Sequence, residues 1–200
     1  MTSDRETGET APGSAGRPLR VLGFAGSLRL GSYNRAALRA AVELAPEGMV
    51  VETFDIAGIP LYSADTEAGG LPGPVEEMSA RVTAADAVLF VTPEYNYSIP
   101  GVLKNAIDWC SRHPQKPFAG KPVAIMGASA GNLGTVRAQM HLRQVFVFLN
   151  VIPLNKPEVF IARAHEKFDG EGRLVDQTTR AQIRALLEAL AAWTRTLRRD

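Results

Sequence analysis

Short apolar runs recur along the chain, and each one ends at glycine, proline or a cluster of polar residues. Runs of this length without regular polar alternation are typical of strands that are buried on both faces. The strand regions predicted in this way are residues 19–26, 49–57, part of 86–96, part of 121–132, and 151–162, the last interrupted at Pro157.

Apolar residues at helical spacing fill the intervals between these runs. The predicted helices cover residues 34–45 and 75–82, a segment that begins near Pro100, residues 133–149, and a closing segment through Ile183 and Leu197. The expected buried face of the helix after Pro100 consists of Val102, Leu103, Ala106, Ile107 and Cys110. Residues 58–74 are rich in glycine and proline, and we expect them to form a long surface loop.

The order of these elements predicts the architecture. Strands that alternate with helices favour a doubly wound, five-stranded parallel sheet with helices on both faces. Neither an internal repeat nor a change of composition divides the chain, so we expect one α/β domain over residues 19–200. In such a sheet, ligands bind outside the carboxyl ends of the strands, where the strand order reverses.

Composition narrows the class of protein without identifying it. A net charge of +1 excludes bulk electrostatic binding to nucleic acid as the main function. Residues 1–18 are polar, so we expect a disordered tail rather than a signal peptide. No apolar run is long enough to span a membrane. The single cysteine, Cys110, fits a reducing, cytoplasmic setting and makes a metal cluster of thiolates improbable.

Candidate chemistry gathers in the turns after the first, third and fourth predicted strands. The first turn, "GSLRLGSYN", has the glycine spacing of a P-loop, but Ser32 stands where that motif needs lysine. The dinucleotide-binding glycine pattern is absent as well. A turn that opens a helix still suits a single phosphate, with Ser27, Ser32 and Asn34 as hydrogen-bond donors and Arg29 as the counter-charge. The alternative is an ordinary turn in which Ser32 caps the helix.

The second turn, "TPEYNYSIPG", carries aromatic bulk that a phosphate site does not need. Pro93, Glu94, Tyr95 and Asn96 can line a flat, partly polar ring. Alternatively, the segment is a stiff turn that caps the next helix at Ser98 or Ile99. The third turn, "GASAGNLG", offers small residues before a helix that we expect Asn132 to cap.

Together, "GSLRLGSYN", "PEYNYSIPGVLKNAIDW" and "GASAGNLGTVRAQ" resemble the NAD(P)H-dependent FMN reductase family, over roughly residues 19–198. The resemblance implies a flavodoxin-like fold with FMN as the cofactor. It also implies roles for particular residues. The flavin phosphate would lie on Ser27, Arg29, Ser32 and Asn34, and the isoalloxazine ring along Pro93, Glu94, Tyr95 and Asn96, with Ser129 and Gly131 approaching from the other side.

The implied activity is the transfer of hydride from NADPH or NADH to FMN, and then of electrons to an acceptor. The flavin carries this chemistry, so no catalytic side chain and no metal are expected. Free flavin, quinones, azo compounds and metal oxyanions all remain possible acceptors. Two rival functions are a flavodoxin-type electron carrier, which binds FMN without oxidising NAD(P)H, and a phosphoanion-binding or regulatory domain without flavin.

The helix predicted over residues 133–149 has two apolar faces. One consists of Ala138, Leu142, Val145, Phe146 and Leu149, and the other of Leu133, Val136, Met140 and Val147. A helix that is apolar on two sides is normally buried on two sides. We therefore expect a homodimer or a dimer of dimers; the alternative is that residues 58–74 cover the second face.

Cys110 is expected in the core, and His113, His141 and His165 on the surface or in structural roles.

Overall fold

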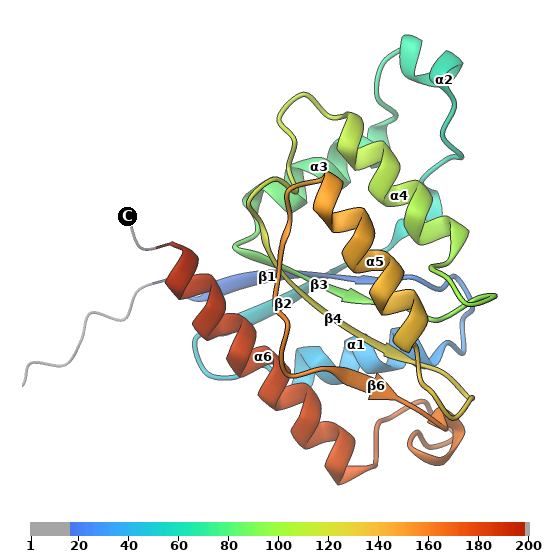
Figure 1. Ribbon diagram of the computed structural model, residues 1–200, viewed down its shortest axis with the longest axis vertical. Coiled ribbons are helices and arrows are strands. Elements are labelled where there is room, and N and C mark those ends of the chain that lie inside the picture. The colour runs from blue at the N-terminus through green and yellow to red at the C-terminus, as the bar shows by residue number, and fades with distance from the viewer. Residues whose placement is uncertain (1–16, 199–200) are drawn as a thin grey trace, which may run out of the picture.

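The computed structural model describes residues 17–198, and its centre is one parallel β-sheet (Figure 1). The strands are β1 (Leu19–Ala25), β2 (Met49–Phe54), β3 (Ala87–Val91), β4 (Pro122–Ala128), β5 (Ile152–Pro153) and β6 (Val159–Ile161). Their order is β2-β1-β3-β4-β5, and β6 also pairs with β4. Every pairing is parallel; Val21, for example, lies opposite both Val51 and Ala87. This order reverses between β1 and β3, as in the flavodoxin-like fold.

Helices cover both faces of the sheet, as the sequence predicts. The helices are α1 (Tyr33–Glu43), α2 (Ala64–Ala68), α3 (Gly73–Ala84), α4 (Gly101–Arg112), α5 (Val136–Phe148) and α6 (Gln177–Leu197), with short 3₁₀ turns η1 (Ile56–Gly58) and η2 (Ala164–Glu166). Helices α1 and α6 pack on one face, and α3, α4 and α5 on the other (Figure 1). Within residues 17–198, none of these helices is both long and apolar enough to cross a membrane.

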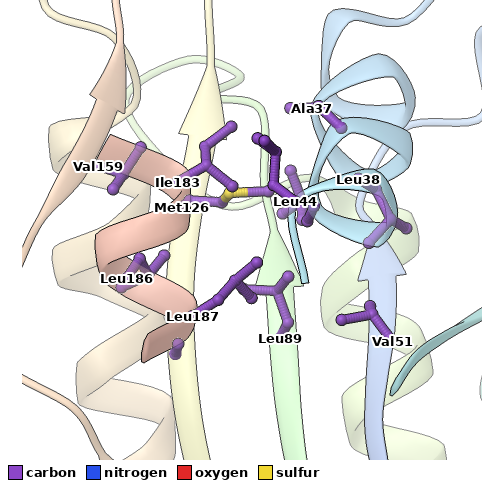
Figure 2. Packing of buried hydrophobic residues seen from close by; sticks show 14 of the residues in the cluster. Ala37, Leu38, Leu44, Val51, Leu89, Met126, Val159, Ile183, Leu186 and Leu187 are labelled. Carbon is purple, nitrogen blue, oxygen red and sulfur yellow. The ribbon is translucent and has the colours of Figure 1, made fainter. Parts of the chain in front are cut away.

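Two apolar clusters, one on each face of the sheet, form the core. Successive residues of one strand belong to opposite clusters, because their side chains point to opposite faces of the sheet. In β3, for instance, Leu89 packs toward α1 and α6, whereas Phe90 packs toward α4 and α5. Figure 2 shows the first cluster, in which Leu89 and Met126 of the sheet meet Ile183 and Leu187 of α6.

The last strand region is divided, which corrects the five-stranded count. Pro157 has no N–H to donate to a sheet ladder, so a strand cannot run through it. The chain instead pairs with β4 twice, through β5 before Pro157 and β6 after it.

Two further sequence-based details differ in the structure. Residues 58–74 are not wholly irregular, because Ser63 caps the short helix α2 within them. Helix α4 begins after Pro100, not at Ser98 or Ile99, and it buries Trp109 in addition to most of the predicted face. Val102 lies at the edge of that face and is only partly buried.

The predicted tail over residues 1–18 falls mainly on residues 1–16, which lie outside the described part of the chain. Arg17 is described, and its guanidinium donates two hydrogen bonds of 2.9 Å to the Asp86 carboxylate. The ordered domain therefore includes Arg17.

Candidate functional site

The three turns chosen from the sequence meet in one cleft at the carboxyl ends of β1, β3 and β4. This is the edge of the sheet, and the reversal of strand order, where ligands of such folds bind. The cleft is lined by Ser27, Arg29, Ser32, Tyr33, Asn34, Pro93, Glu94, Tyr95, Ala128, Ser129 and Ala130. All the predicted site residues except Asn96 and Gly131 are in this lining. Tyr33, Ala128 and Ala130 were not singled out, although each lies inside or beside a turn that was.

Close contact between backbone segments brings the turns together. A Cβ atom at Gly127 would lie 2.1 Å from the Thr92 carbonyl oxygen and 2.2 Å from the Thr135 hydroxyl oxygen. Only glycine fits between the ends of β3 and β4 at this position. Because Gly127 has no side chain, the strand end before the third turn can lie close to the strand end before the second turn.

Ser32 has the capping role that the sequence offered as an alternative. Its hydroxyl oxygen accepts hydrogen bonds from the backbone N–H groups of Asn34 and Arg35, at 3.2 and 3.4 Å. The hydroxyl hydrogen stays available, because a capping oxygen acts only as an acceptor. A serine in this position can therefore cap α1 and still donate to an anion at the amino-terminus of the helix.

The Asn34 side chain links the first turn to the strand end before the third turn by hydrogen bonds. Its side-chain amide donates to the Ala128 carbonyl at 2.8 Å, and its amide oxygen accepts from the Ala128 N–H at 2.8 Å. The residue is buried, so both bonds are shielded from water. This pairing gives Asn34 a structural role in the cleft, and its direct contact with a phosphate stays a prediction.

Arg29 supplies a positive charge at the open end of the first turn. Its guanidinium lies 5.6 Å from the centre of the Tyr33 ring, and it forms no ion pair with a carboxylate of residues 17–198. Because the arginine is exposed and its charge is not neutralised by a neighbour, it can pair with an incoming dianion.

Glu94 belongs to the cleft lining, and its carboxylate caps α5. One carboxylate oxygen accepts from the backbone N–H groups of Arg137 and Ala138, at 2.9 and 3.1 Å, and the other accepts from the Arg137 guanidinium at 3.1 Å. The sequence had assigned this capping role to Asn132. That prediction is wrong, because the helix begins only after Thr135 and the cap comes from a distant strand end.

The rest of the second turn is a tight hairpin. Tyr95 and Ser98 exchange two backbone hydrogen bonds of 3.0 Å, and the residues between them, Asn96 and Tyr97, have φ values of 48° and 67°. Positive φ at both central positions is the signature of a type I′ turn, which accepts asparagine readily. Asn96 is therefore at the tip of the hairpin, outside the cleft lining. Tyr95 reaches back, with its hydroxyl 3.4 Å from the Ser27 hydroxyl.

The third turn is held by its own hydrogen bonds. The Ser129 hydroxyl accepts from the Gly131 N–H at 3.1 Å, and the Gly131 carbonyl accepts from the Arg163 N–H at 3.0 Å. Gly131 thus faces η2 rather than the cleft, while Ser129 and Ala130 remain in the lining.

Cys110 lies in the core, as predicted. It is fully buried on α4, and burial raises the pKa of its thiol to about 12, partly offset by a hydrogen bond with Ser79. A thiol with that pKa is not a nucleophile near neutral pH. No group of three histidine, cysteine or acidic side chains that could hold a metal occurs within residues 17–198.

These features fit FMN. Hydroxyl groups, the amino-terminus of a helix and an arginine that pairs with no carboxylate of residues 17–198 suit the phosphate. In the same cleft, Pro93 and the half-exposed Tyr95 suit a flat aromatic system. The fold and the cleft together define a flavodoxin-like protein of the FMN-binding class.

Comparison with known proteins identifies the family. A model of the family described as NADPH-dependent FMN reductase matches residues 19–166. An NAD(P)H-dependent FMN reductase of Pseudomonas aeruginosa is 59% identical over 180 residues, which cover 90% of this chain and 97% of that protein. The chain belongs to the NADPH-dependent FMN reductase family, and it is an NAD(P)H-dependent oxidoreductase that uses FMN.

Two other relatives agree with this assignment. The quinone reductase of Escherichia coli is 46% identical over 174 residues, with 86% of this chain and 93% of that protein covered. Among solved structures, FerB of Paracoccus denitrificans, a flavoenzyme NAD(P)H:(acceptor) oxidoreductase, has a TM-score of 0.81 at 32% identity. That match covers 89% of this chain and 98% of FerB. The fold and cofactor expected from the three motifs are thereby confirmed.

Proposed function

We propose that the acceptor of this oxidoreductase is a quinone, which it reduces to the hydroquinone at the expense of NAD(P)H and one proton. The observation that carries the proposal is the exposure of an aromatic residue of the cleft lining, since Tyr95 is 50% exposed. A flat acceptor can reach a ring bound there without a conformational opening. Support comes from relatives that are named a quinone reductase and a probable NADPH:quinone oxidoreductase.

Some side chains of the cleft would bind FMN directly, and others would position the turns that bind it. Ser27, Ser32 and Arg29 would bind the phosphate of FMN, while Pro93 and Tyr95 would flank the ring. FMN, when bound, supplies the hydride chemistry, because its ring accepts two electrons from a nicotinamide and passes them on.

Asn34 and Glu94 position these groups without reacting. Asn34 links the phosphate turn to β4, and Glu94 links the aromatic turn to α5. Fixed neighbours of this kind keep a site pre-organised.

Anaerobic mixing of the FMN-loaded protein with NADPH or NADH tests the proposal. We expect the visible absorbance of the flavin to bleach within seconds, and to return when 1,4-naphthoquinone is added. Bleaching without recovery by the quinone, but with recovery by free FMN, an azo dye or chromate, would assign a different acceptor. Failure of both nucleotides to bleach the flavin would favour an electron carrier. Failure to take up FMN at all would favour a phosphoanion-binding domain.

We also propose that the chain forms a homodimer or a dimer of dimers through the outer face of α5. Met140 and Val147 lie seven residues apart on this helix and are 43% and 81% exposed, and Phe148 is 90% exposed. Residues 58–74 do not cover this face; instead they bond to α4, where Pro60 accepts from the Trp109 indole N–H. Large exposed apolar side chains on one face favour a protein partner.

Substitution of Val147 by aspartate should therefore reduce the mass of the particle. A buried, unpaired carboxylate at the centre of an apolar contact costs far more than the contact contributes. Light scattering at micromolar concentration should show the wild-type protein as a dimer or tetramer and the variant as a smaller species. Gln182→Asp, at an exposed position of α6 on the other side of the sheet, is the matched control. A monomeric wild-type protein would contradict the proposal.

The remaining assignments are also proposals. The domain over residues 19–200, with the tail before it, is supported by the continuous core from β1 to α6. A cytoplasmic location is supported by the single, buried cysteine.

A further inference from the structure

A second cleft lies at the amino ends of β1, β3 and β4, at the edge of the sheet opposite the FMN cleft. Its volume is about 310 Å³. The end of α3, the starts of the strands and the carboxyl end of α6 meet there. The lining consists of Arg17, Thr83, Ala84, Ala85, Asp86, Ala119, Gly120, Lys121, Pro122, Leu197 and Arg198. None of these residues lines the FMN cleft, so the two clefts are separate sites.

Positive charge exceeds negative charge in this second cleft. Its lining contains three cations, Arg17, Lys121 and Arg198, and among the described residues Asp86 is its one carboxylate. Both guanidiniums donate hydrogen bonds to that carboxylate. One carboxylate cannot neutralise three cations, and a concave surface with an excess of one charge concentrates ions of the opposite sign. The cleft therefore attracts anions.

The two arginines have donors left for a ligand. A guanidinium carries five N–H groups, and Arg17 uses two of them on Asp86, each at 2.9 Å. The side chains of Arg17 and Arg198 are 62% and 45% exposed, whereas the side chain of Asp86 is only 1% exposed. An anion that enters the cleft therefore meets the guanidiniums and not the carboxylate.

Lys121 adds a third cation, which the end of α3 holds in place. Its ammonium donates to the Ala85 carbonyl at 2.7 Å and to the Thr83 carbonyl at 3.3 Å. An ammonium has three N–H groups, so one remains for a ligand. Burial lowers the pKa of Lys121; Asp86 raises this pKa in part, and Arg198 lowers it again. An anion in the cleft would favour the charged form of the lysine.

We propose that the cleft formed by Arg17, Lys121 and Arg198 is a second anion site, and that it binds a phosphate group. Guanidinium groups suit phosphate because their paired N–H donors match two phosphate oxygens. Two charge-assisted hydrogen bonds correspond to a dissociation constant of about 1 mM. The bound anion would join the residue before β1 to the end of α6, so it would stabilise the folded chain by mass action. The proposal is independent of which acceptor the oxidoreductase uses.

Calorimetric titration of the FMN-loaded protein with inorganic phosphate provides the first test. Bound FMN already occupies the phosphate-binding turn of the other cleft, and chloride keeps the ionic strength constant. We expect saturable binding of one phosphate per chain, with a dissociation constant of about 1 mM. A titration with 5′-AMP identifies the source of the phosphate group, because tighter binding than that of phosphate assigns an ester, and equal or weaker binding assigns the free ion. If neither probe binds saturably, the inference is overturned.

Substitutions at the end of α6 provide the second test. Arg198→Ala should weaken phosphate binding about tenfold. Arg198→Lys keeps the charge without the paired donors, so it should weaken binding less, and it serves as the test variant if Arg198→Ala does not fold. Arg195→Ala is the matched control, because it removes the same charge from the last turn of α6 at an exposed position outside the lining. Its dissociation constant should stay within about twofold of the parent value, since salt screens a distant charge.

Thermal unfolding of the same proteins gives an independent readout. Phosphate should raise the melting temperature of the parent and of Arg195→Ala, and raise that of Arg198→Ala less. Unchanged phosphate affinity in both Arg198 variants would show that the anion binds elsewhere. Equal weakening in Arg198→Ala and Arg195→Ala would show a diffuse attraction and no defined site. Either result would overturn the inference and leave the assignment of the FMN cleft intact.

Discussion

Replacement of Arg29 by alanine is expected to weaken FMN binding about 10- to 100-fold. A charge-assisted hydrogen bond to a phosphate contributes roughly 1.5–3 kcal/mol, and no carboxylate of residues 17–198 competes for the Arg29 guanidinium. The effect should appear in the dissociation constant of FMN, measured by quenching of flavin fluorescence on titration with the apoprotein. Folding should be unaffected, because Arg29 is exposed and the Arg29 backbone bond to Ser32 does not depend on its side chain.

Two variants control this experiment. Arg39→Ala removes an exposed arginine of α1 that lies outside the cleft and donates to the Gly172 carbonyl, so FMN binding should not change. Arg29→Lys keeps the charge but loses the planar, bidentate donor geometry, and should bind FMN with intermediate affinity. If Arg29→Ala holds FMN as tightly as the parent does, the phosphate is bound elsewhere.

The second large effect is expected at Asp86, at the opposite edge of the sheet. Its side chain is only 1% exposed, and it accepts hydrogen bonds from the guanidinium of Arg17, the backbone N–H of Arg20 and the guanidinium of Arg198. Asparagine offers one acceptor oxygen in place of two, and its amide N–H groups would face these donors. Asp86→Asn should therefore lower the free energy of unfolding by about 2 kcal/mol. The corresponding fall in melting temperature is about 4–8 °C for a chain of this size.

The contribution of Asp86 should depend on pH in a definite direction. Burial by itself would raise the pKa of the carboxyl, but the hydrogen bonds from Arg17, Arg20 and Arg198 outweigh it and hold the pKa below its ordinary value. A lowered pKa in the folded state means that the stabilisation is present above the unfolded-state pKa of about 3.9. It is lost as the pH falls through the lower pKa of the folded state.

Urea unfolding at several pH values measures this dependence. The difference in stability between the parent and Asp86→Asn should be full near pH 7 and shrink below about pH 4. Glu77→Gln is the control, because Glu77 is exposed and lies 3.9 Å from Arg81, a geometry that contributes little. A difference that stays constant down to the acid transition would show that Asp86 does not act through its charge.

The strands and most helices follow from local patterning. β3 is recognisable because Ala87–Val91 is apolar at every position, as burial on both faces requires. α6 is recognisable because Ile183, Leu187 and Leu190 repeat at helical spacing. The divided last strand was also visible at Pro157, although the pairing of both pieces with β4 was not. Helix α2 was missed because five residues are too few for a periodic signal.

The site was predictable as a set of turns but not as a network of contacts. Ser27, Ser32 and Pro93 could be chosen because turn chemistry and helix capping are local. The bonds of Asn34 to Ala128 and of Glu94 to α5 join residues 94 and 43 positions apart, and no local pattern encodes such partners. Asp86 was missed for the same reason, because its partners come from both ends of the domain.

The sequence alone determined the alternation of strands and helices, the edge of the sheet where chemistry gathers, and the residue types that suit a phosphate and a flat ring. Each of these depends on neighbours within a few positions, where backbone geometry and side-chain period act directly. The tertiary structure decided which polar groups are free and which are already paired. Among the residues that the structure describes, it left Arg29 without a carboxylate partner, and it paired the Glu94 carboxylate with the first turn of α5. The physical reason is that a buried donor or acceptor must find a partner in space, and folding brings that partner from a distant part of the chain.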